Sequence, residues 1–385
     1  MKRHAGLLVL IACAFVLRLA TLRTAVEGDA PPHGEADERV FITLVAQVRE
    51  HPLAYTLQGT ALLGRLDRHN YDKPIFSHPP AFVYLCAALS SVGLPLPLIP
   101  VLLDLATIVC VYLLALRLHG QREALWTAFL LATCTATWFV SQHIWIDAMV
   151  VFSVALVMVA AERAGRKGTP AAYALAGGAL ALAFLSKITA VLVAPAALAL
   201  VLQADRTALT LRKVGVSLLA AATPCVAWIA LLRIANGEWL PSAFPTAEMM
   251  RRYPFVASIV ARPWHYYLSN LALFAPVFVL AFLRARARDA RDLAPALCAG
   301  AFFVAMTAVG LLQGGYQTRY VAPAYPALAL LAGAAVAQLP ATGVVAAAGL
   351  VAYGAVGGFQ YAVLWTPRFA DLRTSVAEQF IGLFR

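Results

Sequence analysis

Residues 27–80 form a long polar interval near the start of an otherwise apolar chain, and they read EGDAPPHGEADERVFITLVAQVREHPLAYTLQGTALLGRLDRHNYDKPIFSHPP. This interval holds eight of the nineteen acidic residues and four of the eight histidines. It closes on Tyr71-Asp72-Lys73-Pro74 and then Ser77-His78-Pro79-Pro80. Long apolar runs lie on both sides, so we expect a large loop held at one end of a membrane-embedded frame.

The composition excludes an ordinary soluble protein. Of the 385 residues, 62% are hydrophobic and 13% are charged, and the mean hydropathy is +0.76. A soluble domain carries roughly 25% charged residues. The net charge of +11 does not indicate a nucleic-acid partner, because the excess Lys and Arg lies in short loops between apolar runs. The six cysteines fall in apolar segments without close pairing, which favours small buried side chains over a disulfide framework.

Eleven apolar runs approach the roughly 20 residues that cross a bilayer. They lie at residues 6–23, 99–118, 123–142, 147–162, 171–186, 188–203, 213–234, 267–283, 293–312, 320–337 and 342–365. The first run follows a basic tip, contains Arg18 and lacks a small-residue cleavage site, so we expect an uncleaved span. A twelfth run, 80–94, is short and bounded by proline, which predicts a helix lying on the outer membrane surface.

The distribution of Lys and Arg predicts the orientation. If residues 1–3 are cytoplasmic, the inner loops are 117–122, 162–167, 205–213, 284–292 and 338–342, and the first four are rich in Arg and Lys. The outer face then carries a first loop at 24–98, a second large loop at 236–265, and short turns at Asp147, Lys187 and 313–319. We expect one all-α transmembrane domain over 1–385, with its polar chemistry on the outer face.

Three carboxylates are candidates for catalysis. Asp37 and Glu38 follow the first span, where an ionised carboxylate could accept a proton from an attacking hydroxyl. The spacing alone also fits a solvated helix start. Asp147 begins a later span, and the alternative role is an N-cap for a helix from Ala148. His143 could share a helix face with Asp147. Asp104, inside a span, is expected to make a structural hydrogen bond.

Several cations are expected near the outer membrane plane, where Arg and Lys can bind a phosphate or cover lipid headgroups. These cations are Arg18, Lys73, Lys187, Arg251, Arg252, Arg262 and Arg319. Lys187 and Arg319 are the more specific candidates, because each stands alone in a very short turn. His265 lies in an aromatic segment, Pro263-Trp264-His265-Tyr266-Tyr267, that is typical of a membrane interface.

Taken in order, these segments resemble the GT-C membrane glycosyltransferases, and most closely the branch of protein O-mannosyltransferase-like enzymes and lipid A aminoarabinose transferases. The resemblance covers nearly all of the chain. It rests on Asp37-Glu38 after the first span, Asn70-Tyr71-Asp72-Lys73-Pro74, His78-Pro79-Pro80 and Asp147. Leu185-Ser186-Lys187, the His265 segment and Arg319-Tyr320-Val321-Ala322-Pro323 are similar to further segments of the family.

The resemblance implies an all-α GT-C fold and an activity. Members take a sugar from a polyprenyl-phosphate carrier on the outer side of the membrane and pass it to an acceptor, usually with inversion. It implies that Asp37 is the base and that Asp147 assists it or binds the acceptor, and Glu38 is a further catalytic candidate. Lys73 and Arg319 would hold the departing phosphate, with Lys187, His78, Tyr320 and His265 as further binding candidates. The expected partners are a polyprenyl-phosphate sugar, a glycan, lipid or protein acceptor, and the bilayer of a bacterial inner membrane.

The chain departs from the larger members of this superfamily. Only residues 366–385 follow the last predicted span, so no soluble C-terminal domain is expected. Lys73-Pro74 and His78-Pro79-Pro80 are separate motifs here, which leaves open whether Lys73 or His78 lies next to the phosphate. Metal dependence varies within the superfamily; no strong ligand set is visible, and a divalent metal stays open. Two other classes remain: a transporter or flippase of a lipid-linked saccharide, disfavoured by the lack of a repeat, and a non-catalytic scaffold.

Overall fold

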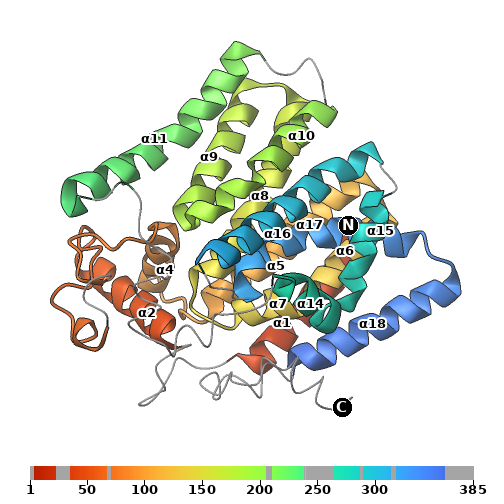
Figure 1. Ribbon diagram of the computed structural model, residues 1–385, viewed down its shortest axis with the longest axis horizontal. Coiled ribbons are helices and arrows are strands. Elements are labelled where there is room, and N and C mark those ends of the chain that lie inside the picture. The colour runs from red at the N-terminus through yellow and green to blue at the C-terminus, as the bar shows by residue number, and fades with distance from the viewer. Residues whose placement is uncertain are drawn as a thin grey trace.

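The computed structural model describes residues 4–22, 35–66, 71–204, 210–237, 239, 264–286, 289–313 and 318–359. Within these ranges the chain is helical and contains no strand (Figure 1). The regular elements are α1 (Ala5–Thr21), α2 (Glu35–Glu50), η2 (Leu63–Arg65), α4 (Ala81–Ser91), α5 (Leu98–Leu118), α6 (Gln121–Ala132), α7 (Thr135–Ser141), α8 (Ile146–Lys167), α9 (Pro170–Ser186), η3 (Ile188–Val193), α10 (Ala194–Ala204), α11 (Leu211–Asn236), α14 (Tyr266–Phe274), η4 (Pro276–Val279), α15 (Leu280–Arg286), η5 (Ala290–Asp292), α16 (Leu293–Gln313), η6 (Thr318–Ala324), α17 (Tyr325–Ala337) and α18 (Ala341–Phe359).

Local sequence signals set the ends of several helices. Thr169 caps α9 by accepting a hydrogen bond from the Ala172 amide, with Pro170 at the first helical position. Thr210 caps α11 in the same way. Gly168 ends α8 with a φ of 63°, a left-handed conformation that a residue without a Cβ adopts without strain.

The predicted helices are confirmed in position, but two of the predicted spans are not straight. In the described part of the chain, five helices are long and apolar enough to cross a membrane, and up to seven if each bent pair counts as one span. The bent pairs are Gln121–Ala132 with Thr135–Ser141, at 56°, and Tyr266–Ala272 with Pro276–Arg286, at 114°. Shorter apolar helices overlap the remaining predicted spans, so the total of eleven stays a prediction.

The main core lies around α17, whose apolar helix is almost wholly buried between α6, α15 and α16 (Figure 1). α5, α8 and α10 complete this core. α11 is the opposite case: it packs along α9 and leaves most of its apolar surface uncovered. Such a surface would be costly in water and is favourable against lipid, which agrees with a membrane-embedded frame.

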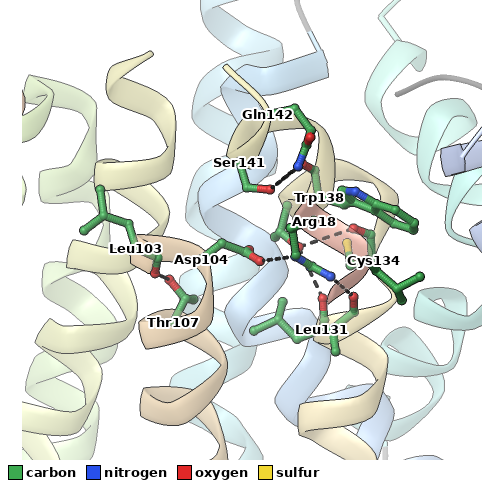
Figure 2. Close-up of polar contacts among 12 residues, drawn as sticks. Arg18, Leu103, Asp104, Thr107, Leu131, Cys134, Trp138, Ser141 and Gln142 are labelled. Carbon is green, nitrogen blue, oxygen red and sulfur yellow. Dashed lines mark hydrogen bonds and ion pairs between the residues drawn. The ribbon is translucent and has the colours of Figure 1, made fainter. Parts of the chain in front are cut away.

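A buried ion pair joins α1 to α5 beside the bend between α6 and α7. Arg18 Nε donates to Asp104 Oδ2 at 2.8 Å, and Arg18 Nη1 donates to the Ala132 carbonyl, the last of α6, at 2.6 Å (Figure 2). The structural role expected for Asp104 is therefore confirmed. The expectation that Arg18 is a cation at the membrane surface was wrong, because its side chain is completely buried. It binds a carbonyl that the helix break leaves without a helical partner.

α4 is a helix of 11 residues, as expected for the run at 80–94. Its length of about 17 Å is too short to cross the roughly 30 Å hydrocarbon core. α4 packs against α2 at the end of the bundle where α8 begins (Figure 1). Its position on the membrane surface stays a prediction.

Candidate functional site

The described part of the first loop is a compact unit with its own aromatic core. Phe41 of α2 packs edge-to-face against Phe76 and Phe82. Tyr55 packs edge-to-face against Phe76 and against Trp228 of α11. This core is why a segment rich in charged residues adopts one conformation, since its apolar side chains are removed from water together.

Hydrogen bonds fix the segment 71–80 on this core. The Phe76 amide donates to the Tyr55 carbonyl at 2.7 Å, and the Tyr55 hydroxyl donates to the His78 carbonyl at 3.0 Å. Thr56 Oγ1 donates to the Lys73 carbonyl at 2.6 Å. The loop therefore presents Lys73 and His78 on a backbone that is held at several points.

Asn236, the last residue of α11, clamps the same segment from the other side. Its Oδ1 accepts a hydrogen bond from the Ile75 amide at 3.1 Å, and its Nδ2 donates to the Ile75 carbonyl at 2.7 Å. These two hydrogen bonds occupy both the amide and the carbonyl of Ile75, as a neighbouring β-strand would. The sequence analysis missed Asn236, because 161 residues separate the two partners.

Two carboxylates and two cations meet beside this loop. Lys187, between α9 and η3, lies 3.0 Å from Asp147 Oδ1 through its Nζ. Arg319 of η6 places Nη2 2.5 Å from Asp37 Oδ2 and Nη1 3.7 Å from Asp147 Oδ2. We call Asp37, Asp147, Lys187 and Arg319 the four-charge cluster. The structure thus brings together four residues that the sequence predicted from four separate segments.

The two carboxylates of this cluster differ in their environment. The Asp147 side chain is 3% exposed, whereas that of Asp37 is 37% exposed. Asp147 lies in the first turn of α8, which begins at Ile146 with Trp145 as its N-cap residue. The alternative of an N-cap at Asp147 is therefore wrong, and its side chain serves the ion pairs instead. Asp37 is the carboxylate of the two that an acceptor molecule can reach.

Glu38 turns away from the cluster although it follows Asp37 directly. Its Oε1 accepts a hydrogen bond from the Ile144 amide at 2.8 Å and lies 3.3 Å from His143 Nδ1. The side chains of consecutive helical residues point in different directions, so this divergence is expected. Glu38 is a positioning residue for the turn between α7 and α8 rather than a second reacting carboxylate. His143 lies in that turn, before α8, and so does not share a helix face with Asp147.

Aromatic rings support both cations. The Arg319 guanidinium lies 4.6 Å from the ring centroid of Trp145, and Lys187 Nζ lies 4.8 Å from that of Tyr320. His143 stacks on Trp145 at 4.0 Å, with the rings nearly parallel. Stacking of this kind holds a guanidinium in one plane and attracts its charge. Tyr320 and Trp145 therefore both lie against the cluster, and the sequence analysis did not single out Trp145.

His78 lies within the electrostatic reach of the four-charge cluster. Burial and then the charge of Lys187 lower the pKa of His78 to about 4, with smaller effects from Asp37, Arg319 and Asp147. The imidazole is consequently neutral at pH 7 and can donate or accept a hydrogen bond without adding charge. Of the two loop residues that the sequence left open, His78 is the one whose pKa responds to the charges of the cluster.

The remaining candidates divide into two groups. His265 begins α14 on the surface, beside the exposed Trp264, and its Nδ1 lies 2.8 Å from Ser269 Oγ on the same helix. This agrees with a place in an interfacial aromatic belt. Arg251, Arg252 and Arg262 lie outside the described residues.

Within the described ranges, no three His, Cys, Asp or Glu side chains gather in a group that could hold a metal ion.

Known proteins resemble this chain in two ways: part of its sequence matches a family model, and its fold matches solved structures. A family model described as dolichyl-phosphate-mannose-protein mannosyltransferase matches residues 77–231. This range includes His78, Asp147 and Lys187 but not Asp37 or Arg319. No curated protein matches the chain.

Solved structures match over almost the whole chain. The apo structure of ArnT from Cupriavidus metallidurans aligns over 95% of this chain and 66% of ArnT, with a TM-score of 0.68 and 18% identity. The same enzyme bound to undecaprenyl phosphate aligns over 94% of this chain and 66% of its own length, with a TM-score of 0.67 and 20% identity. The Archaeoglobus fulgidus oligosaccharyltransferase tethered to an acceptor peptide aligns over 94% of this chain and 55% of its own length, with a TM-score of 0.57 and 14% identity.

These alignments cover more than nine tenths of the chain. The chain spans about two thirds of the length of ArnT and about half that of the oligosaccharyltransferase. This multi-pass membrane protein therefore shares the helical fold of these two transferases, and its residues 77–231 match the model of the protein mannosyltransferase family.

Proposed function

We propose that the protein is an integral membrane glycosyltransferase that moves a sugar from a polyprenyl-phosphate carrier to an acceptor hydroxyl, with inversion. The observation that carries this proposal is the four-charge cluster, in which Arg319 contacts both carboxylates and Lys187 supports the buried one. The structural likeness to an ArnT bound to undecaprenyl phosphate supports a polyprenyl carrier. The cluster unites cations suited to a phosphate with a carboxylate suited to a base.

The cations would stabilise the leaving group. When the bond between the sugar and the carrier phosphate breaks, negative charge develops on the phosphate oxygen, and fixed cations at that point lower the barrier. The Arg319 guanidinium is planar and lies against the Trp145 ring, so it is suited to bind two phosphate oxygens at once. Lys187 adds a point charge. His78 would contribute a neutral hydrogen bond, and Lys73, on the same loop, a further cation.

Asp37 would act as the base in a single displacement. The acceptor oxygen forms a bond to the anomeric carbon, the bond from that carbon to the phosphate oxygen breaks, and its electron pair remains on the phosphate. The acceptor proton passes to Asp37. Asp37 suits this role because it is the exposed carboxylate of the cluster, whereas the buried Asp147 would hold Arg319 and Lys187 in place.

We place this reaction at the outer face of a bacterial inner membrane. The basic loops predicted to be cytoplasmic meet at the end of the bundle away from the cluster. There, Arg117 pairs with Glu162, and Arg284 pairs with Asp289 and Asp292. The positive-inside rule assigns such an end to the cytoplasm, which leaves the cluster outside.

Substitution of the base tests the proposal. The Asp37→Asn variant keeps the size of the side chain and removes its basicity, so transfer from a polyprenyl-phosphate sugar should fall by about 10²- to 10⁴-fold. Glu50→Gln, at the exposed end of the same helix, is the matched control and should keep normal activity. The assay follows labelled sugar from a synthetic polyprenyl-phosphate donor into the total acceptor fraction of bacterial envelopes.

A preliminary measurement identifies the ligand. Native mass spectrometry of gently purified protein should show a bound polyprenyl phosphate or its glycoside, and the mass of the glycoside would give the class of sugar. Full transfer by Asp37→Asn would remove Asp37 from the role of base. Movement of intact donor across proteoliposomes without transfer would instead support a transporter.

A further inference from the structure

Both cations of the four-charge cluster are already occupied by carboxylates. Lys187 binds Asp147, and Arg319 contacts Asp37 closely and Asp147 more distantly. Two positive and two negative formal charges cancel, so the cluster offers no surplus positive charge to an incoming anion. His78 is neutral at pH 7 and does not change this balance. A phosphate that binds Arg319 or Lys187 therefore has to replace a carboxylate at that cation.

The two carboxylates are not equally replaceable. Asp147 is 3% exposed, lies in the first turn of a helix, and contacts both cations. Asp37 is 37% exposed and reaches Arg319 from the edge of the first loop. An exposed ion pair is weaker than a buried one of the same geometry, because water competes for both partners. Asp37 is therefore the partner that a phosphate would displace.

Arg319 can change partners without moving. Its guanidinium lies on the face of Trp145, which is 2% exposed and stacks in turn on His143. Glu38 holds the turn that carries both rings, through the Ile144 amide. Asp147 lies near the other end of the guanidinium, at Nη1, so Nη2 is the position that is exchanged.

We propose that Arg319 binds Asp37 and the donor phosphate in turn, so that arrival of the donor releases the base. This inference rests on the proposed function and adds the order in which donor binding and base release occur. In the resting protein Arg319 neutralises Asp37. When the phosphate takes Nη2, the Asp37 carboxylate loses its cationic partner and can turn to the acceptor hydroxyl, close to the sugar that the same phosphate carries.

The charges balance through the reaction. A sugar phosphodiester enters with one negative charge, and the carrier monophosphate leaves with two, while Asp37 gains the acceptor proton and becomes neutral. A neutral Asp37 does not compete for Arg319, so the dianion keeps both cations. When Asp37 gives its proton to water, it binds Arg319 again and displaces the carrier phosphate. The pair would thus favour product release as well as base activation.

The test measures binding of undecaprenyl phosphate to the purified full-length protein in detergent by microscale thermophoresis. Asp37→Asn should lower the Kd by about tenfold, because it removes the competitor and keeps the shape. Glu50→Gln removes an equal charge at the exposed far end of the same helix, and it should change the Kd by less than about twofold. Asp37→Asn in an Arg319→Gln background should have no effect on the Kd, because the exchange needs Arg319.

Each failure has a separate meaning. If wild type binds undecaprenyl phosphate and Asp37→Asn binds no more tightly, the exchange is wrong and the proposed function stands. Equal tightening with and without Arg319, or by Glu50→Gln, would show a general field effect and overturn the shared role of Arg319. If none of the variants binds undecaprenyl phosphate, the proposed function fails, and the exchange fails with it.

Discussion

Arg319 owes its position to three side chains from two other parts of the chain. Asp37 comes from α2, and Asp147 and Trp145 come from α8 and the residue before it. An Arg in a short polar turn is ordinarily solvated, and its long side chain has many rotamers. The two carboxylates and the indole ring remove that freedom, and the entropy cost is met during folding rather than when a ligand binds.

His78 offers a pH test at the residue scale. Its pKa in the folded protein is about 4, below the ordinary 6.5, so between these values the unfolded chain binds a proton that the folded protein does not. Stability therefore falls as the pH decreases from 6.5 towards 4 and is unaffected by this group above 6.5. His78→Gln removes this contribution. Between pH 7 and pH 5, the Tm of wild type should fall about 2 °C more than that of His78→Gln.

Differential scanning fluorimetry in detergent measures this difference, with buffers of matched ionic strength. His119, which has a similar pKa of about 4, remains in both proteins and cancels from the comparison. Equal losses of Tm in the two proteins would show that His78 is not held in its neutral form.

At the same scale, the sequence predicted single residues better than their pairings. Asp147 was predicted because an acid at the edge of an apolar span is costly unless it is paired or hydrated. Lys187 and Arg319 were predicted because each stands alone in a very short turn, and Asp37 because its place after the first span resembles that of the family's base. Arg18 was misplaced because a sequence does not show that Asp104, 86 residues away, lies beside it. Trp145 and Asn236 were missed for the same reason, since their roles depend on partners from distant segments.

The helices themselves were predictable from the lengths of the apolar runs. A run near 20 residues has few ways to satisfy its backbone in lipid other than as a helix. The bends were not predictable from these runs. The α6–α7 pair passes as one apolar span by composition, and at its 56° break Arg18, from a distant helix, takes the Ala132 carbonyl. The break directs α7 and the following turn towards Glu38 and so contributes to the site.

Neighbouring glycines test the packing of α9 against α11. A Cβ at Gly177 would lie 2.1 Å from the Ser217 carbonyl oxygen, whereas a Cβ at Gly178 would have no atom within 4 Å outside its own helix. Gly177→Ala should therefore force the helices apart and cost about 1–3 kcal/mol or more. Gly178→Ala should be neutral or stabilise by up to about 1 kcal/mol, through better helix propensity.

Thermal unfolding of the two variants in the same detergent provides the comparison. The substitutions are chemically identical and differ only in the helix face they occupy. A Gly178→Ala variant that loses as much stability as Gly177→Ala would show that the close contact between α9 and α11 is not where the structure places it.

For the whole molecule, the decisive dimension is the length of α8. Its 22 residues extend about 33 Å, close to the roughly 30 Å of a bilayer core. Asp147 lies in its first turn and Glu162 near its last, so the four-charge cluster and the Arg117–Glu162 pair lie at opposite ends. The loops that the sequence grouped as cytoplasmic meet at the second end, where His119, Arg284 and Asp292 also contact one another.

The orientation of these two ends is testable with single cysteines. Leu53, in the first loop, is 97% exposed, and Arg122, at the start of α6, is also exposed. In spheroplasts of a bacterial host, a membrane-impermeant maleimide should label Leu53→Cys and should label Arg122→Cys only after the membrane is permeabilised. The parent protein gives the background, because its six native cysteines lie in or beside apolar helices. The reverse pattern would place the cluster in the cytoplasm, where its donor would have to be presented on the inner leaflet, and the proposed outer-face reaction would then be wrong.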